Sequence, residues 1–259
     1  MNRRQPANNI LYRINRALDM LSGDAEGKAP DKALMVEIRK ELLNLPIIYQ
    51  RIPFKEFKNF PYYRDPAPRL ELIRKYEVDF KGKSFLDLGS CLGYYCFSLA
   101  GEVKRGVGLE GDEKLVKICN MIKRMKSLEN IEFYNGFITP QNINKFGKFD
   151  FTIFFSTMHH ILPSKEYYPR PYGWDGEQGE EFAHSILDVI SKNSKRLYFE
   201  MGVPYEAGWE KRLAFMLPDP VKYIQDMLSE HYPSIKIIRP LDLKIIKHNL
   251  DGRPIFLCE

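Results

Sequence analysis

From Lys83 onward, short runs of apolar and β-branched residues alternate with longer runs in which apolar residues recur at helical spacing. The first kind of run is typical of strands and the second of amphipathic helices. The predicted strands are Ser84–Leu88, Arg105–Leu109, Ile131–Tyr134, Phe149–Phe155, Arg196–Glu200, Ile235–Ile238 and Pro254–Cys258. The predicted helices between them are Tyr94–Ala100, Glu113–Lys126, Glu180–Ser191 and one that begins at Asp219-Pro220 and runs to Leu228. This order predicts an α/β fold with a largely parallel sheet, helices on both faces and the first strand near the centre.

The first third of the chain follows a different pattern. Apolar residues at helical spacing predict helices over Ile10–Leu21 and Ala33–Leu45, separated by a polar break and ended by Pro46. The stretch Arg51–Pro68 is rich in proline and aromatic residues and predicts an ordered connector, with a helix over Ala67–Tyr76. We therefore expect an N-terminal helical segment and connector over residues 1–66 and a single domain over residues 67–259.

Composition narrows the class of protein. The chain has 259 residues, of which 44% are hydrophobic and 28% charged, a balance typical of a folded globular protein. No apolar run approaches the ~20 residues that span a bilayer, and no apolar segment follows the basic start. Four cysteines do not make a disulfide framework, and Cys91 and Cys96 are expected to be packed, reduced thiols. These features predict a cytoplasmic protein without a transmembrane segment.

The net charge of +5 is mild, and the basic residues are spread along the chain. A dedicated nucleic-acid binder usually shows a denser basic patch. A nucleic-acid partner is therefore compatible with the sequence but is not favoured, and the oligomeric state is open.

The strongest chemical signal is a glycine-flanked turn between the first strand and the next helix, Leu86-Asp-Leu-Gly-Ser-Cys-Leu-Gly93. Glycines allow the backbone to approach a ligand, and helix N-terminal N–H groups point into such a site. The acidic residue Glu110 ends the second strand, 21 residues after Gly89. A carboxylate at this distance can accept hydrogen bonds from ribose hydroxyls. The alternative interpretation is a tight strand–helix turn that binds no ligand.

These residues resemble the motifs of class I S-adenosylmethionine (SAM) methyltransferases. Leu86 to Gly93 resembles motif I, Val107 to Glu110 the acidic motif after the second strand, and Phe149 to His160 motif IV, with Cys91 in place of the usual middle glycine. The resemblance implies a Rossmann-like, seven-stranded sheet with the last strand antiparallel, and SAM as cofactor. It implies that Asp87 meets the SAM ammonium, that Glu110 holds the ribose, and that the residues at Gly136 and Phe137 flank the adenine.

A narrower resemblance rests on five stretches in the same order, Leu45–Gln50, Arg69–Ile73, His159–Ile161, Phe199–Met201 and Gly252–Leu257. They look like the methyltransferase domain of bacterial polysaccharide chain terminators, which cap O-antigen-type glycans. That family also carries a kinase domain and a coiled-coil tail that this chain lacks, and a shorter segment follows its histidine pair. The full predicted cofactor-binding set is Tyr49, Gln50, Arg69, Asp87, Gly89, Ser90, Gly93, Glu110, Gly111, Gly136, Phe137 and Ser156.

His159 and His160 follow the fourth strand, where the acceptor meets the methyl group. One of them is predicted to be a general base or to orient the nucleophile; the alternatives are packing and turn-capping roles, with catalysis by positioning alone. The aromatic segment Tyr167–Trp174 is expected to cover the acceptor together with Trp209; the alternative is a loop packed against Trp209 or the N-terminal helices. Residues 200–209 are expected to form a further wall of the acceptor site. His184, His231 and His248 are expected to be isolated surface residues. No metal is expected, since metal-dependent relatives place an Asp where Ser156 stands.

We therefore expect methyl transfer from SAM to an oxygen or nitrogen of a small molecule or glycan terminus, with a sugar or sugar-phosphate favoured. A tRNA-modifying methyltransferase and a catalytically inactive SAM-fold partner are alternatives. An NAD-dependent oxidoreductase is a third, although the Gly89 to Gly93 spacing does not fit the G-x-G-x-x-G pattern of that class.

Overall fold

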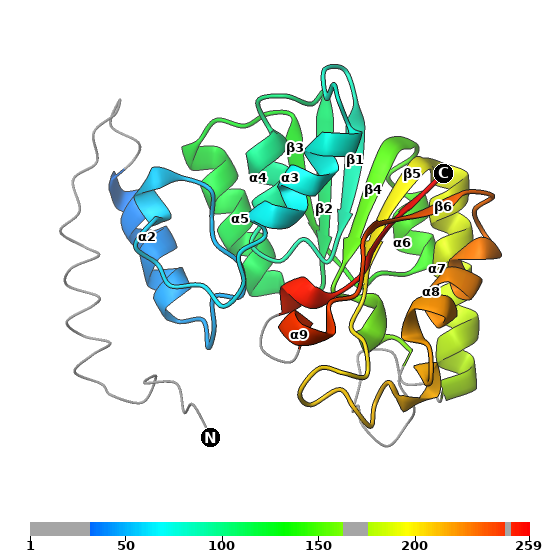
Figure 1. Ribbon diagram of the computed structural model, residues 1–259. Coiled ribbons are helices and arrows are strands. Elements are labelled where there is room, and N and C mark those ends of the chain that lie inside the picture. The colour runs from blue at the N-terminus through cyan, green and yellow to red at the C-terminus, as the bar shows by residue number, and fades with distance from the viewer. Residues whose placement is uncertain (1–31, 163–175, 247–249) are drawn as a thin grey trace.

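A seven-stranded sheet forms the centre of the computed structural model, which describes residues 32–162, 176–246 and 250–259 (Figure 1). Its strand order is β3-β2-β1-β4-β5-β7-β6, and β7 alone runs antiparallel to both of its neighbours. The predicted strands, the central first strand and the antiparallel last strand are confirmed. The strands are β1 (Ser84–Leu88), β2 (Arg105–Glu110), β3 (Ile131–Asn135), β4 (Phe149–Phe155), β5 (Ser194–Glu200), β6 (Ile235–Arg239) and β7 (Ile255–Cys258).

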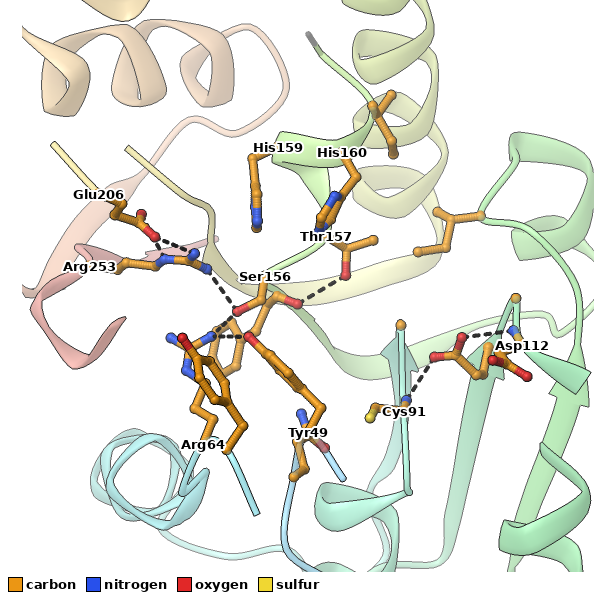
Figure 2. Close-up of a pocket in the computed structure, with 18 of the residues that line it drawn as sticks. Tyr49, Arg64, Cys91, Asp112, Ser156, Thr157, His159, His160, Glu206 and Arg253 are labelled. Carbon is orange, nitrogen blue, oxygen red and sulfur yellow. Dashed lines mark hydrogen bonds and ion pairs between the residues drawn. The ribbon is translucent and has the colours of Figure 1, made fainter. Parts of the chain in front are cut away.

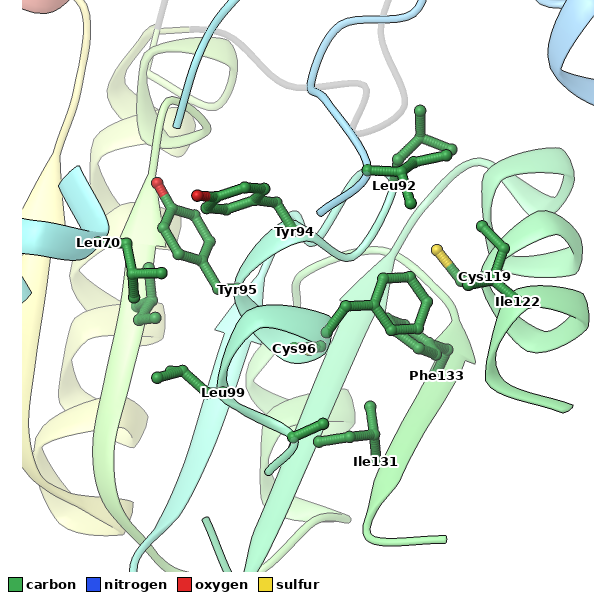
Figure 3. Packing of buried hydrophobic residues seen from close by; sticks show 14 of the residues in the cluster. Leu70, Leu92, Tyr94, Tyr95, Cys96, Leu99, Cys119, Ile122, Ile131 and Phe133 are labelled. Atoms are coloured by element: carbon green, nitrogen blue, oxygen red, sulfur yellow. The ribbon is translucent and has the colours of Figure 1, made fainter. Parts of the chain in front are cut away.

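Helices cover both faces of the sheet, which gives three layers. Successive side chains of a strand point to opposite faces, so Phe85 joins one core and Leu86 the other. The first core packs under α2 (Lys32–Leu43), α3 (Ala67–Tyr76), α4 (Tyr94–Leu99) and α5 (Glu113–Met125). Figure 3 shows part of it, with Tyr95 and Leu99 of α4 beside Leu70. The second core packs under α6 (Pro140–Asn144), α7 (Gly176–Asn193) and α8 (Pro220–Ser229).

Several short elements were not predicted. Helix α6 is capped by the Thr139 side chain, and α9 (Leu243–Ile246) has only four residues. The described part of the chain also contains four 3₁₀ turns, η2 (Lys55–Phe57), η3 (Met158–His160), η4 (Ala214–Met216) and η5 (Leu250–Gly252). Such elements are too short to display a helical period in the sequence. Among the described residues, no helix is both long enough and apolar enough to cross a membrane.

The connector before α3 folds back on itself. The backbone N–H of Tyr63 donates to Ile48 O at 2.9 Å, and that of Arg64 donates to Tyr49 O at 2.8 Å. This pairing places Tyr49 and Arg64 next to each other at the end of the sheet where β1 and β4 finish. Helix α2 packs on α5, with Lys117 Nζ 2.6 Å from Glu41 Oε1. The division at residues 66 and 67 stays a prediction, and the predicted helix Ile10–Leu21 lies outside the described residues.

Candidate active site

A cavity of about 1370 Å³ opens at the carboxyl ends of the parallel strands, where ligands of such sheets bind. A pocket of ~300–1,000 Å³ holds one drug-sized ligand, so this cavity has room for a cofactor and an acceptor together. Ten of the fourteen site residues predicted from sequence line it: Tyr49, Gln50, Gly89, Glu110, Gly111, Gly136, Phe137, Ser156, His159 and His160. The other four, Arg69, Asp87, Ser90 and Gly93, lie behind its wall.

The turn after β1 needs backbone conformations that side chains disfavour. Gly89 has φ +77°, and a Cβ added there would lie 2.5 Å from Thr157 Oγ1. Gly93 has φ +72°, and its Cβ would meet the Phe133 ring at 2.7 Å. Cys91, which replaces the usual middle glycine, itself adopts φ 51°. The turn therefore keeps its left-handed backbone at Cys91, at the cost of local strain.

Glu110 closes the turn from the neighbouring strand. Its carboxylate accepts hydrogen bonds from the backbone N–H of Cys91 at 2.8 Å and from that of Asp112 at 2.9 Å (Figure 2). A carboxylate has about four acceptor positions, so about two remain for hydroxyls of a ligand in the cavity. Burial raises the pKa of Glu110, although the backbone N–H donors oppose this shift.

Beyond Glu110, the cavity wall includes the glycines Gly111 and Gly136 and the ring of Phe137. Gly136 donates its N–H to Glu110 O at 2.9 Å, which holds the β2 and β3 ends together. Phe137 is 47% exposed, and a Cβ on Gly111 would lie 3.3 Å from its ring. A flat, apolar surface beside two glycines suits an aromatic base.

Asp87 lies under the turn, on β1. It is buried, and burial, with the nearby Glu110 charge, raises the pKa of Asp87 to about 8. Ser90 is also buried, and its Oγ has no hydrogen-bond partner among the described residues. These two polar groups stand directly behind the part of the cavity lined by Gly89 and Cys91.

Four guanidinium groups surround the buried Glu200 at the end of β5. Arg69 Nε lies 2.5 Å from Glu200 Oε2, Arg239 Nη2 lies 3.0 Å from the same oxygen, and Arg64 Nη2 lies 3.0 Å from Oε1. Arg253 reaches Glu200 at 3.4 Å and pairs with Glu206 at 2.5 Å. We call Arg64, Arg69, Arg239 and Arg253 the arginine cluster.

The arginine cluster is paired with carboxylates from several elements. Four guanidinium groups face three carboxylates, those of Glu200, Glu206 and Asp251. Burial raises the pKa of Glu200, but the arginines outweigh burial and the net shift is downward. Burial raises the pKa of Glu206, although the neighbouring Arg253 opposes this shift. Arg64 and Arg253 of the cluster open on the cavity, which Asp65, Glu206 and Asp251 also line.

Ser156 joins the arginine cluster to the cavity. Its hydroxyl accepts hydrogen bonds from Arg64 Nη1 and, at 3.1 Å, from Arg253 Nη1 (Figure 2). The same hydroxyl donates to Glu200 Oε1 at 2.9 Å. Ser156 has φ 58°, a strained conformation for a side-chain-bearing residue that is more common at functional sites. Tyr49 lies across from Ser156, and its hydroxyl oxygen accepts a hydrogen bond from Arg64 Nη1 at 3.4 Å.

His159 and His160 stand next to each other on the turn η3 and contact Trp209. His159 is buried, and its Nδ1 accepts a hydrogen bond from the backbone N–H of Gly202 at 3.1 Å. Burial, Arg253 and His160 lower the pKa of His159 well below the usual value. His160 opens onto the cavity, where desolvation, Arg253 and Arg212 lower its pKa to about 4. Both rings are therefore neutral at pH 7.

Arg64 and Arg253 were not predicted to have a role, and Glu200 and Glu206 were expected only as part of a wall of the acceptor site. Glu200 and Arg253 fall within the stretches Phe199–Met201 and Gly252–Leu257 that carried the family resemblance, but a charge in such a stretch does not reveal its partner. Arg69 was predicted to contact the cofactor; its guanidinium instead lies among Glu200 and Asp251, one layer behind the cavity. The cofactor role of Arg69 stays a prediction. The aromatic segment Tyr167–Trp174 lies outside the described residues.

Residues 79–195 match the family described as "Methyltransferase domain". The match covers less than half of the chain; together with the strand order, it supports a methyltransferase with a Rossmann-like fold that uses SAM. No curated protein matches the sequence significantly.

The fold is similar to solved structures of WbdD. A structure of monomeric WbdD is 21% identical, with a TM-score of 0.65 over 85% of this chain and 48% of that one. A second structure, described as the bifunctional kinase-methyltransferase WbdD, is also 21% identical, with a TM-score of 0.65 over 86% of this chain and 46% of that one. The chain thus spans about half the length of these proteins. The N-terminal domain of EvdMO1 with S-adenosylhomocysteine bound is 13% identical, with a TM-score of 0.56 over 91% of this chain and 99% of that one.

The residues of the cavity fit SAM. Gln50 Oε1 is buried without a hydrogen-bond partner among the described residues, so it is an acceptor suited to an ammonium group. Asp87 adds a carboxyl group behind it, Glu110 keeps acceptor positions for hydroxyls, and Phe137 offers an aromatic surface. Hydrogen-bond acceptors and an aromatic surface, the kinds of group that an ammonium, a ribose and a base require, therefore lie in or directly behind one cavity.

Proposed function

We propose that the chain transfers the methyl group of SAM to an oxygen of a sugar or sugar-phosphate acceptor. The observation that carries the proposal is the division of one cavity into two halves. The half around Gly89 and Glu110 presents turn backbone and a carboxylate, and the half around His160 and Trp209 presents aromatic rings beside the arginine cluster. Ser156 lies between the halves.

The cofactor would occupy the first half. We propose that Glu110 accepts the two ribose hydroxyls, that Phe137 and Gly136 flank the adenine, and that Gln50 and Asp87 receive the ammonium. When bound, SAM supplies an electrophilic methyl group on a sulfonium. The protein's part is to orient the acceptor in line with that methyl group and to exclude water.

The acceptor would occupy the second half. Trp209 offers an apolar face of the kind on which sugar rings pack, and its ring lies 5.2 Å from that of His160. Arg64 and Arg253, which open on the cavity, would pair with an acceptor that carries a phosphate or carboxylate. The narrower resemblance to polysaccharide chain terminators agrees with a glycan terminus of this kind.

The two histidines would have different tasks. A neutral His159 whose Nδ1 accepts from Gly202 carries its proton on Nε2, so it can donate a hydrogen bond to the acceptor. His160 is neutral and opens onto the cavity, so it can take the proton of a hydroxyl nucleophile. An anionic phosphate oxygen would need no base, and His160 would then only orient it.

Two measurements test the proposal. Calorimetry should show binding of SAM and S-adenosylhomocysteine and no binding of NAD. Transfer of a labelled methyl group should then be followed with phosphorylated sugars, the matching neutral sugars and tRNA as acceptors. We expect transfer to the phosphorylated sugars. NAD binding without SAM binding would overturn the cofactor assignment, and transfer to tRNA alone would overturn the acceptor.

A further inference from the structure

Three potential metal ligands meet at the junction of α7 and the end of α8. His184 Nδ1 lies 2.9 Å from His231 Nε2 and 3.4 Å from Glu230 Oε2. The ligand atoms of the three residues all lie within 4.8 Å of one another. The expectation that His184 and His231 are isolated is therefore wrong, because the packing of α7 on α8 brings together residues 47 positions apart in the sequence.

The distances match the requirements of a small divalent ion. Zinc binds histidine nitrogen at about 2.0–2.1 Å, which places two ligand atoms of a tetrahedral ion roughly 3.3 Å apart. The two separations from His184 Nδ1, 2.9 and 3.4 Å, lie on either side of this value. Two imidazoles and one carboxylate form a donor set that zinc accepts, with water completing the coordination.

The surroundings favour a cation at this position. Helix α8 ends at Ser229, with Glu230 as its C-cap, so the partial negative charge of the helix end faces the triad. Asp188 lies one turn after His184 on α7, and its charge acts on His231.

We propose that His184, Glu230 and His231 bind a divalent transition-metal ion that fastens α7 to the end of α8. None of the three residues lines the cavity of the candidate active site, so the ion has a structural role and takes no part in methyl transfer. The same pair of helices is already joined at another point, where Tyr223 Oη donates to Glu180 Oε1 at 3.1 Å. The ion would add a second connection.

The test is calorimetric titration of tag-free, chelator-treated full chain with Zn²⁺ at pH 7.5. We expect one ion per chain and a rise in melting temperature on binding. Since loss of even an outer-shell group weakens metal binding about 10–100-fold, His184→Ala and His231→Ala should each weaken it at least tenfold. The Glu230 side chain is highly exposed, so Glu230→Gln should keep the fold, and it should also weaken Zn²⁺ binding. The control is Asp226→Asn, an exposed carboxylate of α8 paired with Lys222, which should bind as the parent does.

Three results would overturn the proposal. The first is no binding at millimolar Zn²⁺, which would leave only a hydrogen bond between the two rings. The second is unchanged affinity in both histidine variants, which would place the ion elsewhere. The third is one ion per two chains with Zn²⁺-induced dimers in sedimentation, which would make the ion a bridge between copies. All these readouts are independent of SAM binding and methyl transfer.

Discussion

The ring of His159 is held in one tautomer by Gly202, whose backbone N–H donates to Nδ1 at 3.1 Å. A neutral His159 therefore presents a proton donor at Nε2, and the adjacent His160 is left as the candidate base. The two histidines share a turn, but the hydrogen bond from Gly202 makes His159 a proton donor and leaves only His160 as a candidate base.

Replacing His160 by glutamine should lower kcat by ~10²–10⁴-fold if it deprotonates the acceptor. The parent's rate should fall as pH approaches about 4, the pKa of His160, because a protonated ring cannot accept a proton. His160→Gln should lose this acidic limb and keep the parent's SAM affinity. Equal rates for parent and variant would mean that catalysis rests on positioning alone.

Glu110→Gln should raise the dissociation constant of SAM at least tenfold. A hydrogen bond to a charged group contributes about 1.5–3 kcal/mol, and the amide keeps only one acceptor oxygen. Titration calorimetry measures the effect. Glu129→Gln, an exposed carboxylate outside the cavity, is the control and should leave the affinity unchanged. Unchanged affinity in Glu110→Gln would contradict the placement of the ribose.

Binding of SAM should release a proton from Asp87. The pKa of Asp87 is raised to about 8, so the carboxyl group is mostly protonated at pH 7, and an incoming ammonium group favours its ionised form. The affinity for SAM should therefore rise with pH up to about 8 and level off above it. Calorimetry at pH 7 in buffers of different ionisation enthalpy should detect close to one proton released. Asp87→Asn should abolish both effects; a parent without buffer dependence would refute the link.

Gly89→Ala should destabilise the protein more than Gly82→Ala. Both glycines have a left-handed backbone, φ +77° and +78°, so the strain of adding a side chain is similar. Only at Gly89 would the new Cβ collide, 2.5 Å from Thr157 Oγ1, whereas nothing lies within 4 Å at Gly82. Urea unfolding should show the difference, and Thr157→Ala should recover part of it in the double variant. Equal losses at the two glycines would mean that the loop relaxes around the clash.

Arg69→Ala should cost about 3–5 kcal/mol of unfolding free energy, because it deprives the buried Glu200 of a partner. Arg74, on the same helix, pairs with Glu102 at the surface, and Arg74→Ala should cost about 0–1 kcal/mol. Denaturant unfolding of the two variants provides the comparison. A similar, small loss for both would show that the remaining arginines hold Glu200 equally well. The SAM affinity of folded Arg69→Ala separately tests the cofactor role that the family resemblance implies.

The sequence by itself determined the strands and the turn that lines the cofactor half of the cavity. Strand β4 is nearly all apolar because it is buried on both faces, and the spacing from Gly89 to Glu110 follows from one strand–helix–strand unit. Such features are local, since they depend on residues within one or two adjacent elements. The same is true of His159 and His160, which directly follow a predicted strand.

Only the tertiary structure decided which charges meet. Arg64 and Glu200 are 136 residues apart, and their pairing depends on the connector folding back beside the ends of β4 and β5. His184 and His231 meet because α7 packs against the end of α8. A charged or imidazole side chain can pair with any suitable group that comes near, so its identity in the sequence does not specify its partner. The order of the strands in the sheet and the packing of the helices determine which partner each of these side chains meets.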